Sequence, residues 1–160
     1  MTTQYNYLPT NTFTFVLGRL PAATFYAQRM ELPSISANYP DLPFPGANQP
    51  VFSDKLTYSD LSITFIVDEN MLNYIELFKW LQQQKAYTSF VPTDSEPQYS
   101  DGHLSIMTSS SNQNKVVKFK KMFPVSLSEI QFDTTQTETQ YATCTAAFKF
   151  SDMEFSDFAT

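Results

Sequence analysis

Few residues in this 160-residue chain have the types and spacing that catalysis or metal binding requires. His103 is the only histidine and Cys144 is the only cysteine, and they are far apart in the sequence. The sequence therefore has too few histidines and cysteines to favour a catalytic dyad or a four-ligand zinc site. His103 is expected at the surface, and Cys144, flanked at alternate positions by alanines, is expected to be a small buried hydrophobe. We expect no enzyme activity, catalytic residue, metal site or cofactor.

The other candidate motifs are also incomplete. Three glycines, Gly18, Gly46 and Gly102, are too few for a phosphate-binding loop or a dinucleotide fingerprint, so nucleotide binding is disfavoured. Two groups of carboxylates, within 94–101 and 152–157, lack the ligand spacing of a calcium-binding loop. We expect both groups to be solvated acidic surface.

Charge argues against a grip on nucleic acid. The formal net charge is -6, so a phosphate backbone is not attracted by the chain as a whole. The only basic cluster is formed by Lys115, Lys118, Lys120 and Lys121, which we expect to be solvated or interfacial. Only 16% of residues are charged while 42% are hydrophobic, which indicates that partners cover much of the surface.

The chain is long enough for one domain with a real core. One cysteine excludes an intrachain disulfide, and residues 1–9 have no secretory signal pattern, so synthesis in a reducing cytoplasm is expected. No run approaches the roughly 18 apolar residues of a membrane span. We expect a protein that is soluble or assembled, without membrane insertion.

The most definite pattern lies in residues 56–84. Leu61, Ile63 and Phe65 alternate with polar residues, as a half-buried strand requires. An amphipathic helix over about 70–85 follows, and Trp80 is expected to anchor it. Its expected core-facing residues are Met71, Tyr74, Ile75, Phe78 and Leu81.

Further alternation predicts strands along the rest of the chain. They are expected near 12–17, 24–32, 103–107, 115–119, 122–133 and 141–150, with a bulge between Ser128 and Glu129. The strands at 103–107 and 115–119 are expected to form a hairpin. The fold class is therefore mainly β: an antiparallel β-sandwich or barrel of six to eight strands with one packed α-helix.

Prolines mark the segment 33–50 as a long, stiffened loop, because they fix φ and remove N–H donors. Loops of this length in compact domains are usually functional or disordered. Apolar residues within 42–52 favour an ordered arm, spanning about 33–55, that docks on something. The alternative is a loop that folds back onto its own core.

Two segments carry a resemblance to a known family. One is YSDLSITFIVDE followed by NYIELFKWL, and the other is FKKMFPVSLSEIQFDTTQTETQYATCTAAFKFSDMEF. With TFTFVLGRL and LPSIS before them, in this order, the chain resembles the tail-tube proteins of long-tailed bacteriophages and related contractile injection systems. The resemblance covers most of the chain, residues 1–160 as a single domain, although no single motif is diagnostic.

The resemblance implies a structural virion protein that forms hexameric rings around a channel for genome delivery. The rings stack into a tail tube in the virion, assembled in the host cytoplasm. Its implied partners are further copies of itself, sheath, baseplate or terminator proteins, and double-stranded DNA in transient, non-specific passage. Closing a ring pairs the open strand edges of a small sandwich, and stacking is a heterologous contact.

Site residues follow from this expectation. The arm is expected to reach the next ring through Leu42, Phe44, Pro45, Gly46, Val51 and Phe52. The lumen should be polar and not basic, so that DNA can slide, and its expected residues are Glu138, Gln140, Thr143 and Thr145. The outer face of the helix, toward sheath or solvent, is expected to carry Asn73, Glu76 and Lys79.

Two alternatives remain open. The same fold serves as tube initiator, baseplate–tube junction or tail terminator, and the VDEN helix start resembles the junction proteins as much as the repeating subunit. From a different class, the composition also permits a monomeric small β-barrel that binds a ligand or carbohydrate.

Overall fold

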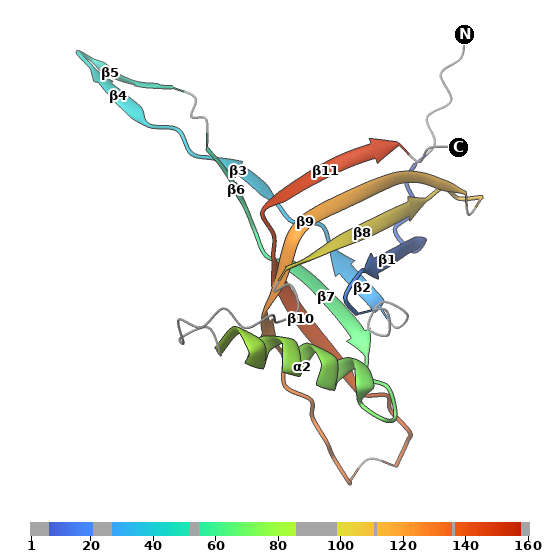
Figure 1. Cartoon of the computed structure of the whole chain (residues 1–160). Coiled ribbons are helices and arrows are strands. Elements are labelled where there is room, and N and C mark those ends of the chain that lie inside the picture. The colour runs from blue at the N-terminus through green and yellow to red at the C-terminus, as the bar shows by residue number, and fades with distance from the viewer. Residues whose placement is uncertain are drawn as a thin grey trace.

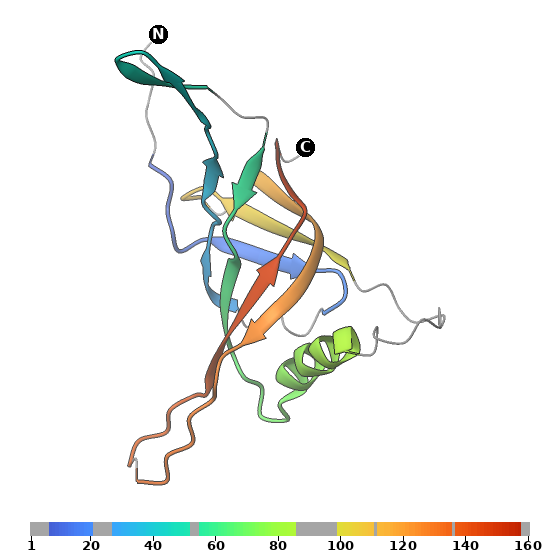
Figure 2. The ribbon, with the colours of Figure 1, turned by 90° about the vertical axis from the view of Figure 1, so that its left-hand side faces the viewer.

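The structure is a computed structural model that describes residues 7–20, 27–51, 55–85, 99–110, 112–135 and 137–157. Seven antiparallel strands form a sandwich of two sheets that share strand β9 (Figures 1 and 2). Sheet I contains β1 (Phe13–Leu17), β8 (Ser100–Met107), the first part of β9 (Gln113–Leu127) and β11 (Asp152–Asp157). Sheet II contains the last part of β9, β10 (Thr143–Lys149), β7 (Leu61–Ile66) and β2 (Ala27–Glu31). The expected antiparallel sandwich with one helix is confirmed, and its sheets do not close into a barrel.

Strand β9 changes sheets at Lys121. Residues 115–120 pair with β11, whereas residues 123–127 pair with β10. Lys121 lies between these ladders with φ 52, and its N–H donates to Asp101 Oδ1 at 3.0 Å. A non-glycine residue in the left-handed region is uncommon, and it interrupts the extended conformation of the strand locally. This turn lets one strand contribute to both layers.

The separate strands expected at 115–119 and 122–133 are therefore wrong. Alternation is interrupted at the left-handed residue although the strand continues, and β9 ends at Leu127. The bulge expected between Ser128 and Glu129 is also misplaced. Ser126 pairs with Ala147 and Pro124 with Phe148, so the extra residue is Val125.

The core lies between the two sheets. The apolar faces expected for β1, β7 and β10 are buried. Phe119 and Phe150 meet edge to face with centroids 5.2 Å apart. Cys144 is buried as expected, and burial raises the pKa of its thiol.

Strand β11 was not expected, because the last strand was predicted to end the domain near Phe150. Only Met153 is buried in this strand, so burial does not alternate along it as in a half-buried strand. Half of its residues are acidic. These carboxylates, considered without their neighbours in space, predict a solvent-exposed segment and not a strand. Pairing with β9 nevertheless brings this segment into sheet I.

Helix α2 (Leu72–Lys85) packs on the core face of sheet II through Leu77 and Trp80. Trp80 lies 6.3 Å from the Phe148 ring, as its expected anchoring role requires, and Gln84 Nε2 donates to the Pro124 carbonyl at 2.9 Å. The expected core-facing side of the helix is wrong for two of its five residues, whereas Tyr74 does pack against the core. Ile75 and Phe78 are 39% and 45% exposed, whereas Asn73, Leu77 and Trp80 are buried. Apolar residues surround most of this helix, so periodicity alone could not identify the buried side.

Asn73 joins α2 to the end of β7 and is fully buried. Its Nδ2 donates to the Ile66 carbonyl at 2.8 Å, and its Oδ1 accepts from the Asp68 N–H at 3.2 Å. The expectation that Asn73 lies on the outer face of the helix is therefore wrong. Its amide satisfies backbone groups in the β7–α2 turn, and buried polar side chains are generally hydrogen-bonded in this way.

The proline-rich segment forms strands where a loop was expected. Its ladders are β3 (Ile35–Ala37) with β6 (Leu56–Tyr58), and β4 (Asp41–Phe44) with β5 (Ala47–Pro50). These ladders continue the β2–β7 pair as one interrupted ribbon that extends away from the sandwich, hereafter the arm (Figure 1). Gly46, at φ 97, forms the turn. Prolines are tolerated because each strand of a two-stranded ribbon has one open side.

The β9–β10 connection, residues 128–142, leaves the opposite end of sheet II from the arm (Figure 2). No strand is assigned within its described residues, and Gln136 lies outside them. Sheet II therefore carries a projection at each end.

Gly102 is packed where a Cβ would not fit. An added Cβ would lie 2.4 Å from Met122 Sδ and 3.2 Å from Phe15 Cζ, and both side chains are buried. We expect Gly102→Ala to lower the free energy of unfolding by about 1–3 kcal/mol through overpacking, measured by chemical denaturation. Gly18→Ala is the matched control, because its nearest neighbours would be 3.6 Å away. Equal effects of the two substitutions would contradict this packing.

Asn73→Ala should also destabilise the chain. The substitution leaves the Ile66 carbonyl and the Asp68 N–H without their buried partner, so we expect a loss of about 1–3 kcal/mol in the free energy of unfolding. Lys79→Ala on the exposed side of the same helix should change stability by less than about 0.5 kcal/mol. A neutral Asn73→Ala variant would show that the turn does not depend on this amide.

Candidate assembly surfaces

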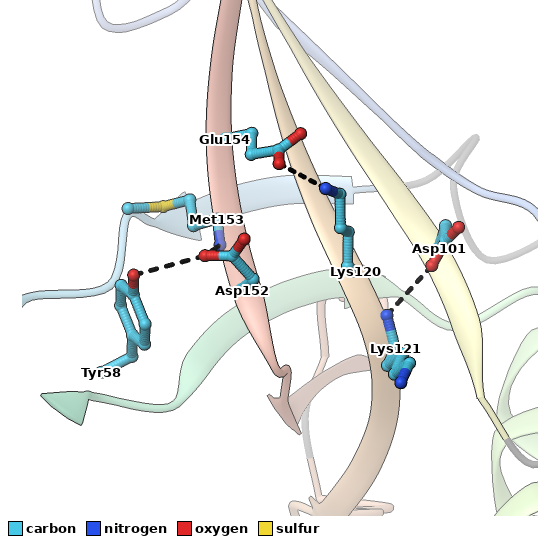
Figure 3. Close-up of polar contacts among 7 residues, drawn as sticks. All are labelled: Tyr58, Asp101, Lys120, Lys121, Asp152, Met153 and Glu154. Atoms are coloured by element: carbon cyan, nitrogen blue, oxygen red, sulfur yellow. Dashed lines mark hydrogen bonds and ion pairs between the residues drawn. The ribbon is translucent and has the colours of Figure 1, made fainter. Parts of the chain in front are cut away.

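The basic cluster lies on sheet I beside the acidic β11. Lys120 forms an ion pair with Glu154 across the β9–β11 ladder (Figure 3). Lys115 forms another with Asp157 on the same ladder. The hydrogen bond to Glu154 raises the pKa of the Lys120 ammonium. Each exposed pair adds little stability, but together they bring two of the four lysines next to carboxylates of β11. This surface is therefore poorly suited to hold a phosphate backbone.

The face of sheet II that points away from the core is small and polar. Thr64 and Thr145 are joined across β7 and β10 by a hydroxyl–hydroxyl hydrogen bond of 3.0 Å. Arg29 is paired with Glu31 at 2.8 Å. Other residues on this face, hereafter the threonine face, are Ser62, Ile66, Thr143, Ala147 and Lys149.

Charges at the threonine face are compensated locally. Lys149 pairs with Asp60 at 2.6 Å, in addition to the Arg29–Glu31 pair. Surface hydroxyls and paired charges leave few strong sites for a passing polymer.

Of the residues expected in the lumen, two lie on the threonine face. Thr143 is exposed and Thr145 is half-buried on β10. Glu138 and Gln140 are exposed but lie in the 128–142 connection, beyond the sheet. Their position in a lumen stays a prediction.

Sheet II has two open edges. Among the described residues, no strand pairs with the outer side of β2 or of residues 123–127 in β9. The four strands alternate in direction, so placing β2 of one copy beside β9 of another would continue the antiparallel order. Pro124, which has no N–H, lies at this edge, where proline is tolerated; it is buried and its carbonyl accepts from Gln84 Nε2, so α2 covers this part of the edge.

The arm carries most of the residues expected to contact another ring. Leu42 is 51% exposed, and Pro45 and Gly46 are exposed at the turn. Val51 is half-buried. The side chain of Phe44 and the whole of Phe52 lie outside the described residues, and the contact itself stays a prediction.

The opposite projection carries exposed aromatic residues. Phe132 and Tyr141 in the 128–142 connection are each 78% exposed, and a cavity of about 690 Å³ lies between the two halves of this connection. The chain thus exposes apolar side chains at both ends of sheet II. Sequence patterning had predicted a strand through Phe132 and so missed this projection.

Helix α2 borders a groove of about 530 Å³ beside the end of β1. The Arg19 guanidinium stacks 5.0 Å from the Trp80 ring and donates to Gln83 Oε1 at 2.5 Å. Glu76 is half-buried, and within the described part of the chain its Oε2 has no hydrogen-bond partner. Lys79 is exposed. The expectation that Glu76 and Lys79 face a sheath or solvent stays a prediction.

The described residues contain no cluster of histidine, cysteine and carboxylates with a geometry for metal binding. In the same part of the chain, no helix has the length and apolar character to cross a membrane. The main surface features of the described residues are the arm, the 128–142 connection, the threonine face and the edges of sheet II.

Neither a protein-family model nor a curated protein matches this chain. Several solved structures match in fold. A chain of the anti-feeding prophage baseplate aligns over 96% of this chain and 97% of its own length, with a TM-score of 0.72 and 12% identity. A chain of the sheath/tube terminator of the extracellular contractile injection system PVC aligns over 97% and 99%, with a TM-score of 0.69 and 16% identity. One from the PVC sheath–tube complex aligns over 95% and 93%, with a TM-score of 0.67 and 13% identity.

These identities are too low to transfer a role, but each alignment spans nearly the whole of both chains. The resemblance in the sequence and the likeness in structure therefore agree at the level of architecture: this chain has the fold found in the tube, terminator and baseplate assemblies of contractile injection systems.

Proposed function

We propose that this chain is a structural, non-catalytic subunit of a tail-like apparatus, in which six copies form a ring around a channel. The observation that carries the proposal is sheet II, a four-stranded antiparallel sheet that has no further strand at either edge within the described residues and whose face away from the core is mostly polar. Joining β2 of each copy to β9 of the next satisfies both edges and removes an aggregation hazard. Because the contact is heterologous and the ring closes, no edge remains.

The threonine face is the proposed channel lining. Helix α2 packs on the opposite, core-facing side of sheet II, so a ring with α2 outside places Thr64 and Thr145 inside. Locally paired charges favour passage over retention, since a lysine that neutralises a phosphate would hold nucleic acid. We propose a virion tail assembled in the host cytoplasm, with double-stranded DNA in non-specific transit.

Stacking is the proposed task of the arm. It extends from one end of sheet II, and the 128–142 connection extends from the other (Figure 2). A head-to-tail contact of this kind generates an open stack of rings. The same ring also suits an initiator, junction or terminator position, where partners of the same tail cover one end.

Electron microscopy of the purified chain tests the ring. At high protein concentration we expect six-fold rings or hollow rods with a central channel. Light scattering on the same sample should show species far larger than the 18.3 kDa monomer. A monodisperse monomer at every concentration would contradict the proposal and favour a monomeric binding module.

Leu42→Asp tests stacking separately from ring closure. A charge on the exposed arm should desolvate unfavourably in an inter-ring contact, so we expect rings to persist while rods shorten or disappear. Val16→Asp is the matched control, because Val16 is 48% exposed on β1, away from the arm. Rods of unchanged length in the Leu42→Asp sample would show that the arm does not carry the contact.

A further inference from the structure

The β4–β5 ladder, hereafter the tip of the arm, has backbone groups that point out of the ribbon at definite positions. At the start of this ladder the Val51 N–H donates to the Pro40 carbonyl at 3.1 Å. In an antiparallel ladder, hydrogen-bonded pairs alternate with pairs whose N–H and C=O groups point away from the partner strand. Every second pair from this bond onward is therefore directed outward. The outward pairs are Asp41 with Pro50 and Pro43 with Asn48.

Each edge of the tip thus has two outward positions, and one of the two is a proline. Pro43 lies on the β4 edge and Pro50 on the β5 edge, and both are exposed. Proline has no N–H, and its ring occupies the place of the hydrogen that an added strand would accept. A strand laid along β4 can therefore accept only from the Asp41 N–H, and a strand laid along β5 only from the Asn48 N–H.

The β3–β6 ladder, hereafter the base of the arm, lacks this pattern. The Ser59 N–H donates to the Ser34 carbonyl at 3.1 Å, so the same alternation identifies the outward positions of the base. None of them is a proline, and each retains its N–H. These residues are Ile35, Ala37, Leu56 and Tyr58. Proline at the outward positions is therefore a property of the tip and not of the whole arm.

The tip is the part of the arm that other chains can reach most easily. It forms a two-stranded sheet of its own, and no other described strand pairs with it. In Figure 1 it is the part of the arm farthest from the sandwich, and no other labelled element lies beside it. Leu42 is 51% exposed there. A long exposed edge with unpaired N–H and C=O groups is a template for pairing with further strands.

We propose that Pro43 and Pro50 prevent strand addition at the tip of the arm, so that the tip contacts other protein surfaces through its side chains and not through backbone hydrogen bonds. The prolines keep the projecting ribbon from pairing with further chains before assembly. This role does not depend on the ring proposed above. In a stack of such rings, it limits the contact of the tip to side chains such as Leu42.

Restoring the missing donors tests the proposal. Pro43→Thr with Pro50→Thr gives each edge of the tip a second outward N–H. We expect this variant to sediment as irregular aggregates, with a rise in thioflavin T fluorescence, from about tenfold lower protein concentration than the parent. Pro40→Thr is the matched control, because the N–H restored at residue 40 faces Val51 inside the ribbon. The control should aggregate at the parental concentration.

An onset in the double variant equal to that of the parent or of the Pro40→Thr control would overturn the proposal. The soluble double variant should keep the parental unfolding transition, because both prolines are exposed and lie outside the core. Pro50→Thr alone restores one edge and should give an intermediate onset.

Hydrogen exchange on the aggregates locates the new contact. Amides within residues 41–50 should exchange more slowly in aggregates of the double variant than in its soluble form. Unchanged exchange in this segment would show that the chains associate elsewhere, and it would also overturn the proposal. Absence of rings in the parent would contradict the proposed function and leave this comparison of variants valid.

Discussion

The structure depends on one strand that belongs to two sheets. Strand β9 pairs with β8 and β11 along its first part and with β10 along its last part. The left-handed conformation of Lys121 makes this possible, and the Asp101 carboxylate accepts its N–H. Without this turn the two layers would not be covalently continuous through a strand. The enclosed core, and the surface on which α2 packs, follow from it.

Sheet II places its polar and apolar faces on opposite sides with little ambiguity. Cys144, Ala146 and Phe148 face the core, while the intervening threonines and alanine face away. The polar face is nearly neutral because its cations are paired with nearby carboxylates. Sheet I and α2 cover the apolar face. The unsatisfied parts of the sheet are therefore its edges, and edges are best satisfied by other strands.

The alternating strands were the most predictable part of the fold. Leu61, Ile63 and Phe65 sit where a period of two places them, because each has a single face to bury. The side of α2 that packs inward was not predictable, since Ile75 and Phe78 are as apolar as Leu77. The arm was misjudged as a loop because proline counts do not reveal whether a partner strand leaves one side open. Strand β11 escaped detection because its carboxylates are matched by lysines on β9, more than 30 residues earlier in the sequence.

The candidate surfaces differ in the same way. Thr143 and Thr145 could be placed on a polar face from alternation alone, whereas Asn73 could not be placed, because its burial depends on backbone groups of a turn. Polar character predicts exposure only when the surrounding backbone has no need of a partner.

The arm has a mechanical consequence. Its ladders continue the β2–β7 pair, and the Ser59 N–H and Val51 N–H bridge the gaps between them at 3.1 Å. A force applied at the Gly46 turn along the ribbon therefore acts parallel to the strands and perpendicular to their hydrogen bonds. The two strands are joined at this turn, so both covalent backbones carry the force together and the hydrogen bonds between them are not pulled apart. Tension at the tip would pass directly into the backbone of sheet II, with no side-chain interface to yield first.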